Sequence, residues 1–273
     1  MRTTHALHRL LRAALLAGLL VTQGTGRAET LGTPVRTLAV GPGFTPAYEG
    51  ADEYRMIPFV VARARWGARY SVGTAGTGFR ADIFGSRFVE AGPAVSFRFA
   101  RNSDADDPVI ARLPEIEQAI EIGGHLALNF PFPLTANRRD ALTVDSEWLW
   151  DVSGSHGGQL GRFSLRYRGQ VSDTLVVQTG PYLDYRSDTF ARTYYGVRPS
   201  AAAASGLAPF EADGGISATG YRLNVRVDIS DSWNMTASGA VDRKLGDFAE
   251  SPLTSQRGAR TTYFAGLAVG QSF

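Results

Sequence analysis

Two histidines are the residues of this 273-residue sequence best suited to acid–base chemistry. His125 follows Glu121 by four positions, and His156 stands in the segment 153–158, soon after Asp151. A Ser-His-Asp device needs such a histidine beside a hydroxyl nucleophile and a carboxylate that orients the ring. Neither histidine stands in a motif typical of a hydrolase or of an Asp-His protease, so we predict a protein that is not an enzyme. Catalysis by His125 or His156 is the alternative.

The sequence offers little for a metal or a cofactor. It has no Cys, which excludes a thiolate metal site, a Cys nucleophile and a disulfide framework. The segment Asp104–Asp107 carries three aspartates at a spacing similar to that of calcium loops, but the required Gly and Glu are missing. Glu49, Asp52 and Glu53 could attract cations or the divalent ions that bridge lipopolysaccharide. Solvated acidic loops are the plainer interpretation of both clusters, and we predict no metal and no cofactor.

Charged residues within stretches of alternating apolar and polar residues are more informative. In the alternation they occupy the polar positions, so they share one face of each strand. All basic residues except Lys244 are arginines. Arginine presents a planar fork of donors that suits packed ion-pair networks. These charges could pair and fill a closed lumen, which we favour, or leave a narrow polar pore. The residues predicted to line the lumen are Arg63, Arg65, Glu90, Arg98, Glu121, His125, Asp145, Glu147, Arg162, Arg166, Arg168, Asp184, Arg222, Arg226 and Asp228.

The elements that must position these side chains are strands. Apolar and polar residues alternate with period two over stretches of about ten residues, broken by Gly, Pro, Asp, Asn and Ser. Val89, Val95 and Phe97, for example, share one face of their stretch, and Glu90 and Arg98 share the other. Twelve strands are predicted, at 35–44, 56–66, 68–75, 77–84, 88–100, 117–130, 141–152, 159–170, 174–187, 216–229, 233–245 and 260–273.

Connection lengths favour a membrane barrel over a water-soluble sandwich. In a sandwich the apolar faces would form a core, whereas in a barrel they would contact lipid. Alternate connections are mostly tight, such as Gly67 and 85–87, although 131–140 is longer. The long connections between them are 45–55, 101–116, 188–215 and 246–259. Short turns on one side and long loops on the other are typical of outer-membrane barrels, with both chain ends on the periplasmic side. The strands within 68–84 are the weakest part of this prediction.

Aromatic residues near the predicted strand ends support the barrel. They could form the two interfacial girdles that border the lipid-facing band. They are Trp66, Phe84, Phe88, Phe99, Phe130, Trp148, Trp150, Tyr185 and Trp233. The chain also ends on an alternating strand with a terminal Phe273, which is typical of outer-membrane proteins because their assembly machinery reads the last strand. The 44% hydrophobic content agrees, because only every second strand residue would contact lipid.

The first 28 residues predict a cleaved export signal. Three arginines precede an unbroken apolar run at 13–21, and small residues follow at positions 26 and 28. The run is too short to span a bilayer as a helix, which needs roughly 17–25 residues. The expected organisation is therefore a signal peptide, 1–28, and an outer-membrane barrel, 29–273. Removing the signal turns a formal charge of +2 into −2, so the pI of about 9.0 gives no reason to expect nucleic-acid binding.

Four segments combine Gly, Pro and Tyr in ways that strand alternation does not explain. They are Gly41–Asp52, with Pro46, Tyr48 and Gly50; Ala91–Pro93; Tyr194, Tyr195 and Gly196 leading to Gly206 and Glu211; and Leu245–Asp247 followed by Ser251 and Pro252. In this order, and over nearly the whole mature chain, they resemble the MltA-interacting protein (MipA/OmpV) family of Gram-negative outer-membrane proteins. Phe210 departs from the family, where we expect Tyr.

The resemblance implies a scaffold of the cell envelope. Family members are associated with a murein lytic transglycosylase and a penicillin-binding protein in peptidoglycan turnover, beside the lipid and lipopolysaccharide that surround the barrel. Binding of such partners would use the periplasmic side, where the short turns, Glu29–Arg36 and the connection 131–140 with Arg138 and Arg139 are expected. The alternatives are a small pore or a surface adhesin of the outer membrane. The long loop 188–215 could fold back onto the barrel mouth through Tyr194, Tyr195 and Phe210.

Overall fold

The computed structural model describes residues 35–67, 69–101, 107–135, 137 and 139–273. Residues 33–273 form one compact unit. The predicted signal peptide, 1–28, and the predicted start of the mature chain lie outside the described residues. No helix in the described part of the chain is both long and apolar enough to cross a bilayer.

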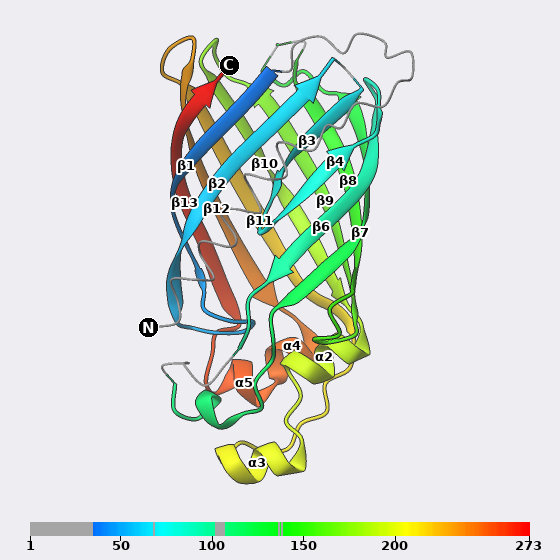
Figure 1. Ribbon diagram of the computed structural model, residues 1–273, viewed down its shortest axis with the longest axis vertical. Helices are drawn as coiled ribbons and strands as arrows, with labels where there is room; N and C mark the ends of the chain where they lie inside the picture. Colours follow the sequence, from blue (N-terminus) through cyan, green and yellow to red (C-terminus); the bar gives the residue numbers. More distant parts are fainter. Residues whose placement is uncertain (1–34, 68, 102–106, 136, 138) are drawn as a thin grey trace, which may run out of the picture. The chain divides into compact units, whose positions relative to one another are not determined.

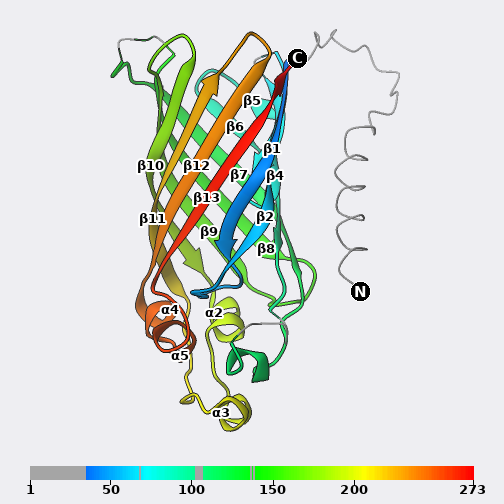
Figure 2. The same cartoon turned by 90° about the vertical axis from the view of Figure 1, so that its left-hand side faces the viewer.

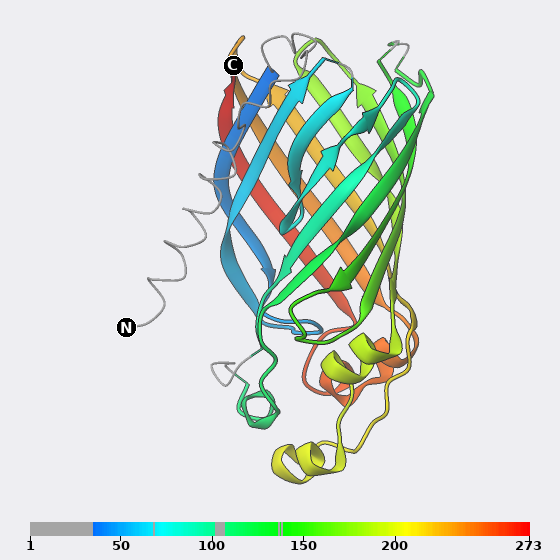
Figure 3. The same ribbon diagram turned by 45° about the vertical axis from the view of Figure 1, so that its right-hand side comes forward.

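The described residues form a closed antiparallel β-barrel in which strands that are consecutive in sequence lie side by side (Figures 1 and 3). The strands are β1 (Val35–Pro46), β2 (Tyr54–Trp66), β3 (Tyr70–Ala75), β4 (Gly78–Asp82), β5 (Phe84–Gly85), β6 (Val89–Arg98), β7 (Ala119–Pro131), β8 (Ala141–Asp151), β9 (Gln159–Gln170), β10 (Leu175–Arg186), β11 (Gly215–Asp228), β12 (Trp233–Lys244) and β13 (Thr261–Ser272). Because β4 and β5 are separated only by Ile83 and both pair with β6, they occupy one strand position. The predicted up-and-down barrel of about twelve strands is confirmed.

The alternation of the sequence becomes the two faces of the barrel wall. Leu38, Val40, Leu223, Leu267 and Val269 are among the large apolar side chains that are exposed on the outside. An apolar outer face is the face that transmembrane barrels present to lipid, and the residues between them point into the lumen. Of the aromatic residues expected at the strand ends, Phe84, Phe88, Phe130, Trp150 and Trp233 are exposed.

The two ends of the barrel differ in their connections (Figure 2). Phe273 lies at the end with short turns, where its backbone exchanges two hydrogen bonds with Arg36 of β1. We call this the short-turn end. The opposite end, the helical end, carries η1 (Ile110–Arg112), α2 (Asp188–Tyr194), α3 (Pro199–Ser205), α4 (Gly246–Glu250) and α5 (Pro252–Ser255). The alternation of short and long connections that the sequence predicts therefore separates two structurally different ends.

The wall is least regular where the sequence pattern is weakest. β2 pairs with β3 only from Arg63 to Trp66, and the hairpin of β3 and β4 turns early, at Gly76, whose φ is +60°. Where this ladder ends, the Thr74 hydroxyl accepts the backbone N–H of Ala62 at 3.1 Å. The side chain thus replaces the missing strand partner at that position, since an unpaired N–H facing lipid is costly.

Candidate functional site

The long loops fold into a compact cap over the helical end. Two apolar clusters hold it together, one around Phe190, Tyr194, Tyr195 and Phe248 and one around Tyr48, Ile110, Val197 and Leu253. Phe210 packs against both clusters. Burial of each side chain of this size stabilises the folded protein by about 1.5–3 kcal/mol. The cap is therefore held together mainly by the packing of its apolar side chains.

The motif residues of three of the four sequence segments meet in this cap, although they lie far apart in the chain; Ala91–Pro93 instead lies within β6 of the barrel wall. Tyr48, Gly50, Tyr194, Tyr195, Ser251 and Pro252 are buried; Pro46, Gly196, Gly206 and Asp247 lie beside them or at the ends of the cap's elements. Val197 and Phe210 form a backbone bridge, and so do Ala51 and Gly258. The cap is therefore the feature of the fold that the motifs encode.

Local chemistry explains why these residues stand where they do. Pro199 occupies the first turn of α3, where a missing N–H costs nothing, and Gly206 ends that helix in the left-handed conformation at φ +80°. Ser251 caps α5 by accepting the N–H of Leu253. Its hydroxyl also donates to the carbonyl of Tyr195 at 2.6 Å, which ties α5 to the end of α2.

Glu49 is the central charge between the cap and the lumen. It accepts hydrogen bonds from Lys244 Nζ at 3.3 Å, from the Tyr195 hydroxyl at 3.0 Å and from Arg98 Nη1. Burial alone would raise the pKa of Glu49, but Lys244 and Arg98 more than offset this and hold the pKa well below its usual range. The sequence suggested a solvated loop for Glu49; that interpretation is wrong, because the closing of the barrel brings β6 and β12 around it.

Glu121 extends this network to one of the two histidines. It is fully buried and accepts from Arg98 Nε at 2.8 Å and pairs with His156 Nε2 at 3.2 Å. The other ring nitrogen of His156 accepts the backbone N–H of Gly158 at 3.0 Å. Both nitrogens are thus engaged in structural bonds, and the neighbouring hydroxyls of Ser153 and Ser155 donate elsewhere. The geometry is that of a packed ion-pair network rather than of a nucleophile and its base.

His125 lies deeper in the lumen and has a different arrangement. Its Nε2 contacts Asp82 Oδ1 at 2.9 Å, and the Ser71 hydroxyl donates to the other oxygen of Asp82. In a catalytic triad the histidine stands between the serine and the carboxylate. Here Asp82 stands between Ser71 and His125, so no hydroxyl of the described residues is bonded to the histidine.

Toward the helical end of the barrel, most of the predicted lumen charges form ion pairs. Arg80 binds Glu147 at 2.5 Å and Asp145 at 3.0 Å, and Arg162 holds Asp184 with two bonds of 2.6 Å. Sequence reasoning missed Arg80, Glu49, Lys244, Arg186 and Tyr182 as members of the network. Lys244 carried a signal, being the single lysine, whereas Arg80 lies in the poorly patterned stretch.

The remaining predicted lumen residues lie toward the short-turn end or between the halves. Arg65 and Glu90 are 3.5 Å apart, and Arg226 and Asp228 pair at 2.8 Å along the same strand. Arg222 lies over the ring of Tyr182 at 5.3 Å, while Arg166 and Arg168 have no carboxylate partner among the described residues. The structure thus gathers the predicted charges into two groups of unlike composition.

The acidic loops do not form a metal site in the described residues, where no group of three or more His, Cys, Asp or Glu side chains could hold an ion. Asp107 instead accepts the backbone N–H of Val109 at 2.7 Å and pairs with Arg257 at 2.7 Å. Asp104 and Asp106 lie outside the described residues.

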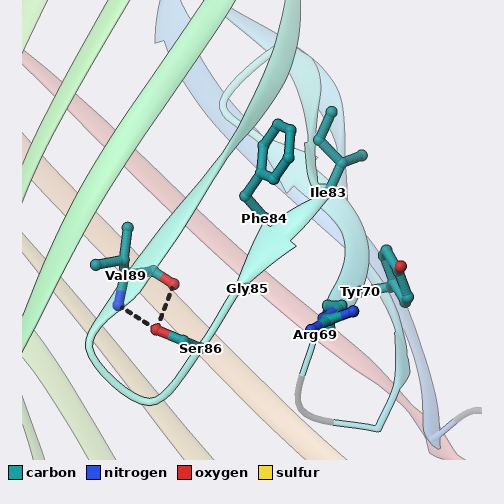
Figure 4. A pocket seen from close by; sticks show the side chains of 7 residues that line it. All are labelled: Arg69, Tyr70, Ile83, Phe84, Gly85, Ser86 and Val89. Atoms are coloured by element: carbon teal, nitrogen blue, oxygen red, sulfur yellow. Dashed lines mark hydrogen bonds between the residues drawn. The ribbon is translucent and has the colours of Figure 1, made fainter.

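A cavity of about 420 Å³ opens at the irregular part of the wall (Figure 4). Its lining comes from the start of β3, from β5 and from the turn before β6; it comprises Arg69, Tyr70, Ile83, Phe84, Gly85, Ser86 and Val89. The Ser86 hydroxyl accepts the N–H of Val89 at 3.0 Å and fixes the turn on one side. A narrow recess that shares Arg69, Tyr70 and Gly85 with the cavity is also lined by Arg65, Asp82 and Glu90.

Comparison with known proteins identifies one family. A family model described as MltA-interacting protein MipA matches residues 38–273. No curated protein matches the chain. A solved structure, described as the crystal structure of a Pseudomonas aeruginosa FadL homologue, is similar over 88% of this chain and 87% of that chain, with 10% sequence identity and a TM-score of 0.30.

Proposed function

The chain belongs to the MltA-interacting protein MipA family, and from this membership we propose that it is an outer-membrane scaffold for enzymes of peptidoglycan turnover. Its partners would be a murein lytic transglycosylase, as the family's name suggests, and a penicillin-binding protein. The observation that carries the proposal is the family match, which covers almost the whole barrel and includes the cap that the motif residues build. The proposed role is binding without catalysis.

The proposed location is the outer membrane, reached through a cleaved signal peptide at 1–28. The apolar outer wall supports this location, because an alternating strand presents one side to lipid and the other to the lumen. The terminal Phe273 is exposed at the short-turn end, where an assembly machinery could reach it. We assign the short-turn end to the periplasm and the cap to the outside of the cell, the arrangement usual for such barrels.

The proposed docking surface is the periplasmic side, in particular the connection between β7 and β8. Asp140 anchors this connection by accepting hydrogen bonds from Thr135 at 2.6 Å, from the Tyr167 hydroxyl at 2.9 Å and from the N–H of Gln170 at 2.9 Å. Burial would raise the pKa of Asp140, but these bonds lower it to about 2. The described part of this connection would therefore lose little conformational freedom when a partner binds; Arg138 lies outside the described residues.

A pull-down from an envelope extract tests the scaffold. The purified protein is expected to capture a lytic transglycosylase, and reversing charges with Arg138→Glu and Arg139→Glu is expected to reduce the capture several-fold. The matched control is Arg192→Glu, an exposed charge of the cap at the opposite end. Capture that is unchanged in the double variant would remove this connection from the docking surface, and no capture by the unaltered protein would contradict the scaffold itself.

The alternative of a small pore has one observation in its favour, the hydrated arginines at the short-turn end. Against it stands the cap, whose packed clusters cover the helical end. Conductance in a planar bilayer separates the two functions. The scaffold predicts no steady ion current, whereas a current that changes with Arg222→Glu would establish the pore.

A further inference from the structure

Five arginines crowd the lumen near the short-turn end. Arg63 and Arg65 come from β2, Arg166 and Arg168 from β9, and Arg226 from β11. All belong to the inward-facing phase of their strands. Arg65, Arg168 and Arg226 lie within two residues of the strand ends, and Arg63 and Arg166 lie one inward position deeper. We call these five residues the arginine cluster.

The charges of the arginine cluster act on one another across the lumen. Arg63 lies close enough to Arg166 for their charges to interact, although β2 and β9 are not neighbours in the sheet. Arg168 interacts in the same way with Arg65 and with Arg226. Like charges that converge from separate strands repel one another unless something of opposite charge lies between them.

The protein itself supplies too few carboxylates for this cluster. Glu90 contacts Arg65 at 3.5 Å, and Asp228 pairs with Arg226 at 2.8 Å. Asp82 faces Arg63 but is already bonded to His125 and Ser71, and Asp140 faces Arg168 but already accepts from Thr135, Tyr167 and Gln170. Among the described residues, Arg63, Arg166 and Arg168 have no ion pair with a carboxylate.

Water reaches the arginine cluster from the short-turn end. Arg63 is exposed although it points into the barrel, and the side chains of Arg65 and Arg226 are 44% and 34% exposed. Glu121, in the other half of the lumen, is fully buried. The arginine cluster is therefore in contact with solvent, unlike the charges of the other half.

We propose that the arginine cluster binds a small multivalent anion whose phosphate or carboxylate oxygens bridge the guanidinium groups of β2 and β9. The planar fork of arginine donates two parallel hydrogen bonds to either group. A narrow lumen with low-dielectric walls concentrates the positive potential and with it the anion. The site is independent of the scaffold role, because it needs no protein partner.

Titration calorimetry on the full-length protein, folded in detergent micelles at low ionic strength, tests the site. Sodium pyrophosphate is expected to bind saturably, and citrate serves as the second probe, so that the two titrations separate a phosphate ligand from a carboxylate ligand. The double variant Arg63→Gln, Arg166→Gln is expected to lose affinity by about tenfold or more, because several charge-assisted hydrogen bonds are lost. Arg36→Gln is the matched control: it removes a charge from the same end, on the outward-facing phase of β1.

Two results would overturn the site. One is heat no larger for both probes than for sodium chloride at the same ionic strength. The other is an equal loss of affinity in the Arg36→Gln control, which would mean that only the overall charge attracts the anion. If the double variant does not reach the folded state, Arg166→Gln alone is titrated, and unchanged pyrophosphate binding by this variant would overturn the site as well. None of these results depends on capture of a cell-wall enzyme.

Discussion

The two halves of the lumen use arginine in opposite ways. Near the helical end, Arg98, Arg162 and Lys244 each contact at least one carboxylate, and side chains such as Glu121 and Asp184 are almost or completely buried. Near the short-turn end, three of the five arginines of the cluster have no ion pair with a carboxylate in the described part of the chain, and Arg63 and Arg65 are exposed to solvent. One strand pattern thus yields a packed network at one end and a hydrated, positively charged mouth at the other.

The cap accounts for the difference. By excluding water from the helical end, it raises the cost of any unpaired charge there. Arg98, Arg162 and Lys244 are paired with carboxylates, and the buried Arg101 instead donates to the carbonyl of Tyr194. No comparable structure covers the short-turn end in the described residues, and an arginine there keeps its hydration without a partner. Inward-facing charged side chains therefore have a structural role where the cap excludes water. Where no cap covers them, they remain available to bind a ligand.

The largest expected effect comes from breaking the packed network. Arg98→Leu leaves the buried Glu121 without its main partner and removes one of the two cations that contact Glu49, and we expect the free energy of unfolding to fall by about 3–5 kcal/mol. Urea unfolding in detergent micelles, followed by tryptophan fluorescence, measures this. The matched variant Arg63→Leu, in the open half, is expected to change stability by about 0.5 kcal/mol or less. Equal losses in the two variants would contradict the division of the lumen.

Acid should weaken the helical end through Glu49. Because folding lowers the pKa of this carboxyl, its contribution is complete above the unfolded pKa of about 4.3 and is lost as the pH falls through the lower folded pKa. We expect about 2 kcal/mol of stability to disappear gradually below about pH 4. Urea unfolding at a series of pH values measures it. Glu49→Gln should flatten the pH dependence; an unchanged profile in that variant would assign the acid loss to other carboxyls.

A smaller effect is expected within the cap. Ser251→Ala removes the cap of α5 and leaves the carbonyl of Tyr195 without its buried donor, which should cost about 1–2 kcal/mol. The same urea titration measures the loss, and limited proteolysis of the cap should become faster. Ser200→Ala, at an exposed position of α3, is the control. A loss in the control as large as that in Ser251→Ala would argue against a specific role of this hydroxyl.

The smallest effect concerns salt. Repulsion within the arginine cluster should be screened by added sodium chloride, so stability should rise by a few tenths of a kcal/mol between low and about 0.15 M salt. Arg166→Gln should remove part of this rise, because it removes one of the charges that face Arg63. Unfolding midpoints at the two salt concentrations test it. A salt response that is the same with and without Arg166 would place the repulsion elsewhere.

Much of the fold follows from the sequence alone. Alternation in strands such as β7 and β11 assigns each side chain to one face, because successive residues of a strand point to opposite sides. The strand positions, the inequality of the connections and the family motifs are local or nearly local signals. The region 70–85 was predicted least well, since short irregular strands carry little alternation.

The tertiary structure alone decided which charges meet. Arg98 and Glu49 belong to distant segments, and only the closing of the barrel and the packing of the cap bring them into contact with Lys244. Sequence reasoning placed Glu49 in a solvated loop and Arg166 among the lumen charges, yet Glu49 is paired with Arg98 and Lys244, whereas Arg166 has no ion pair with a carboxylate among the described residues. Their difference arises because pairing depends on strand register, barrel closure and exclusion of water, and no local pattern encodes these.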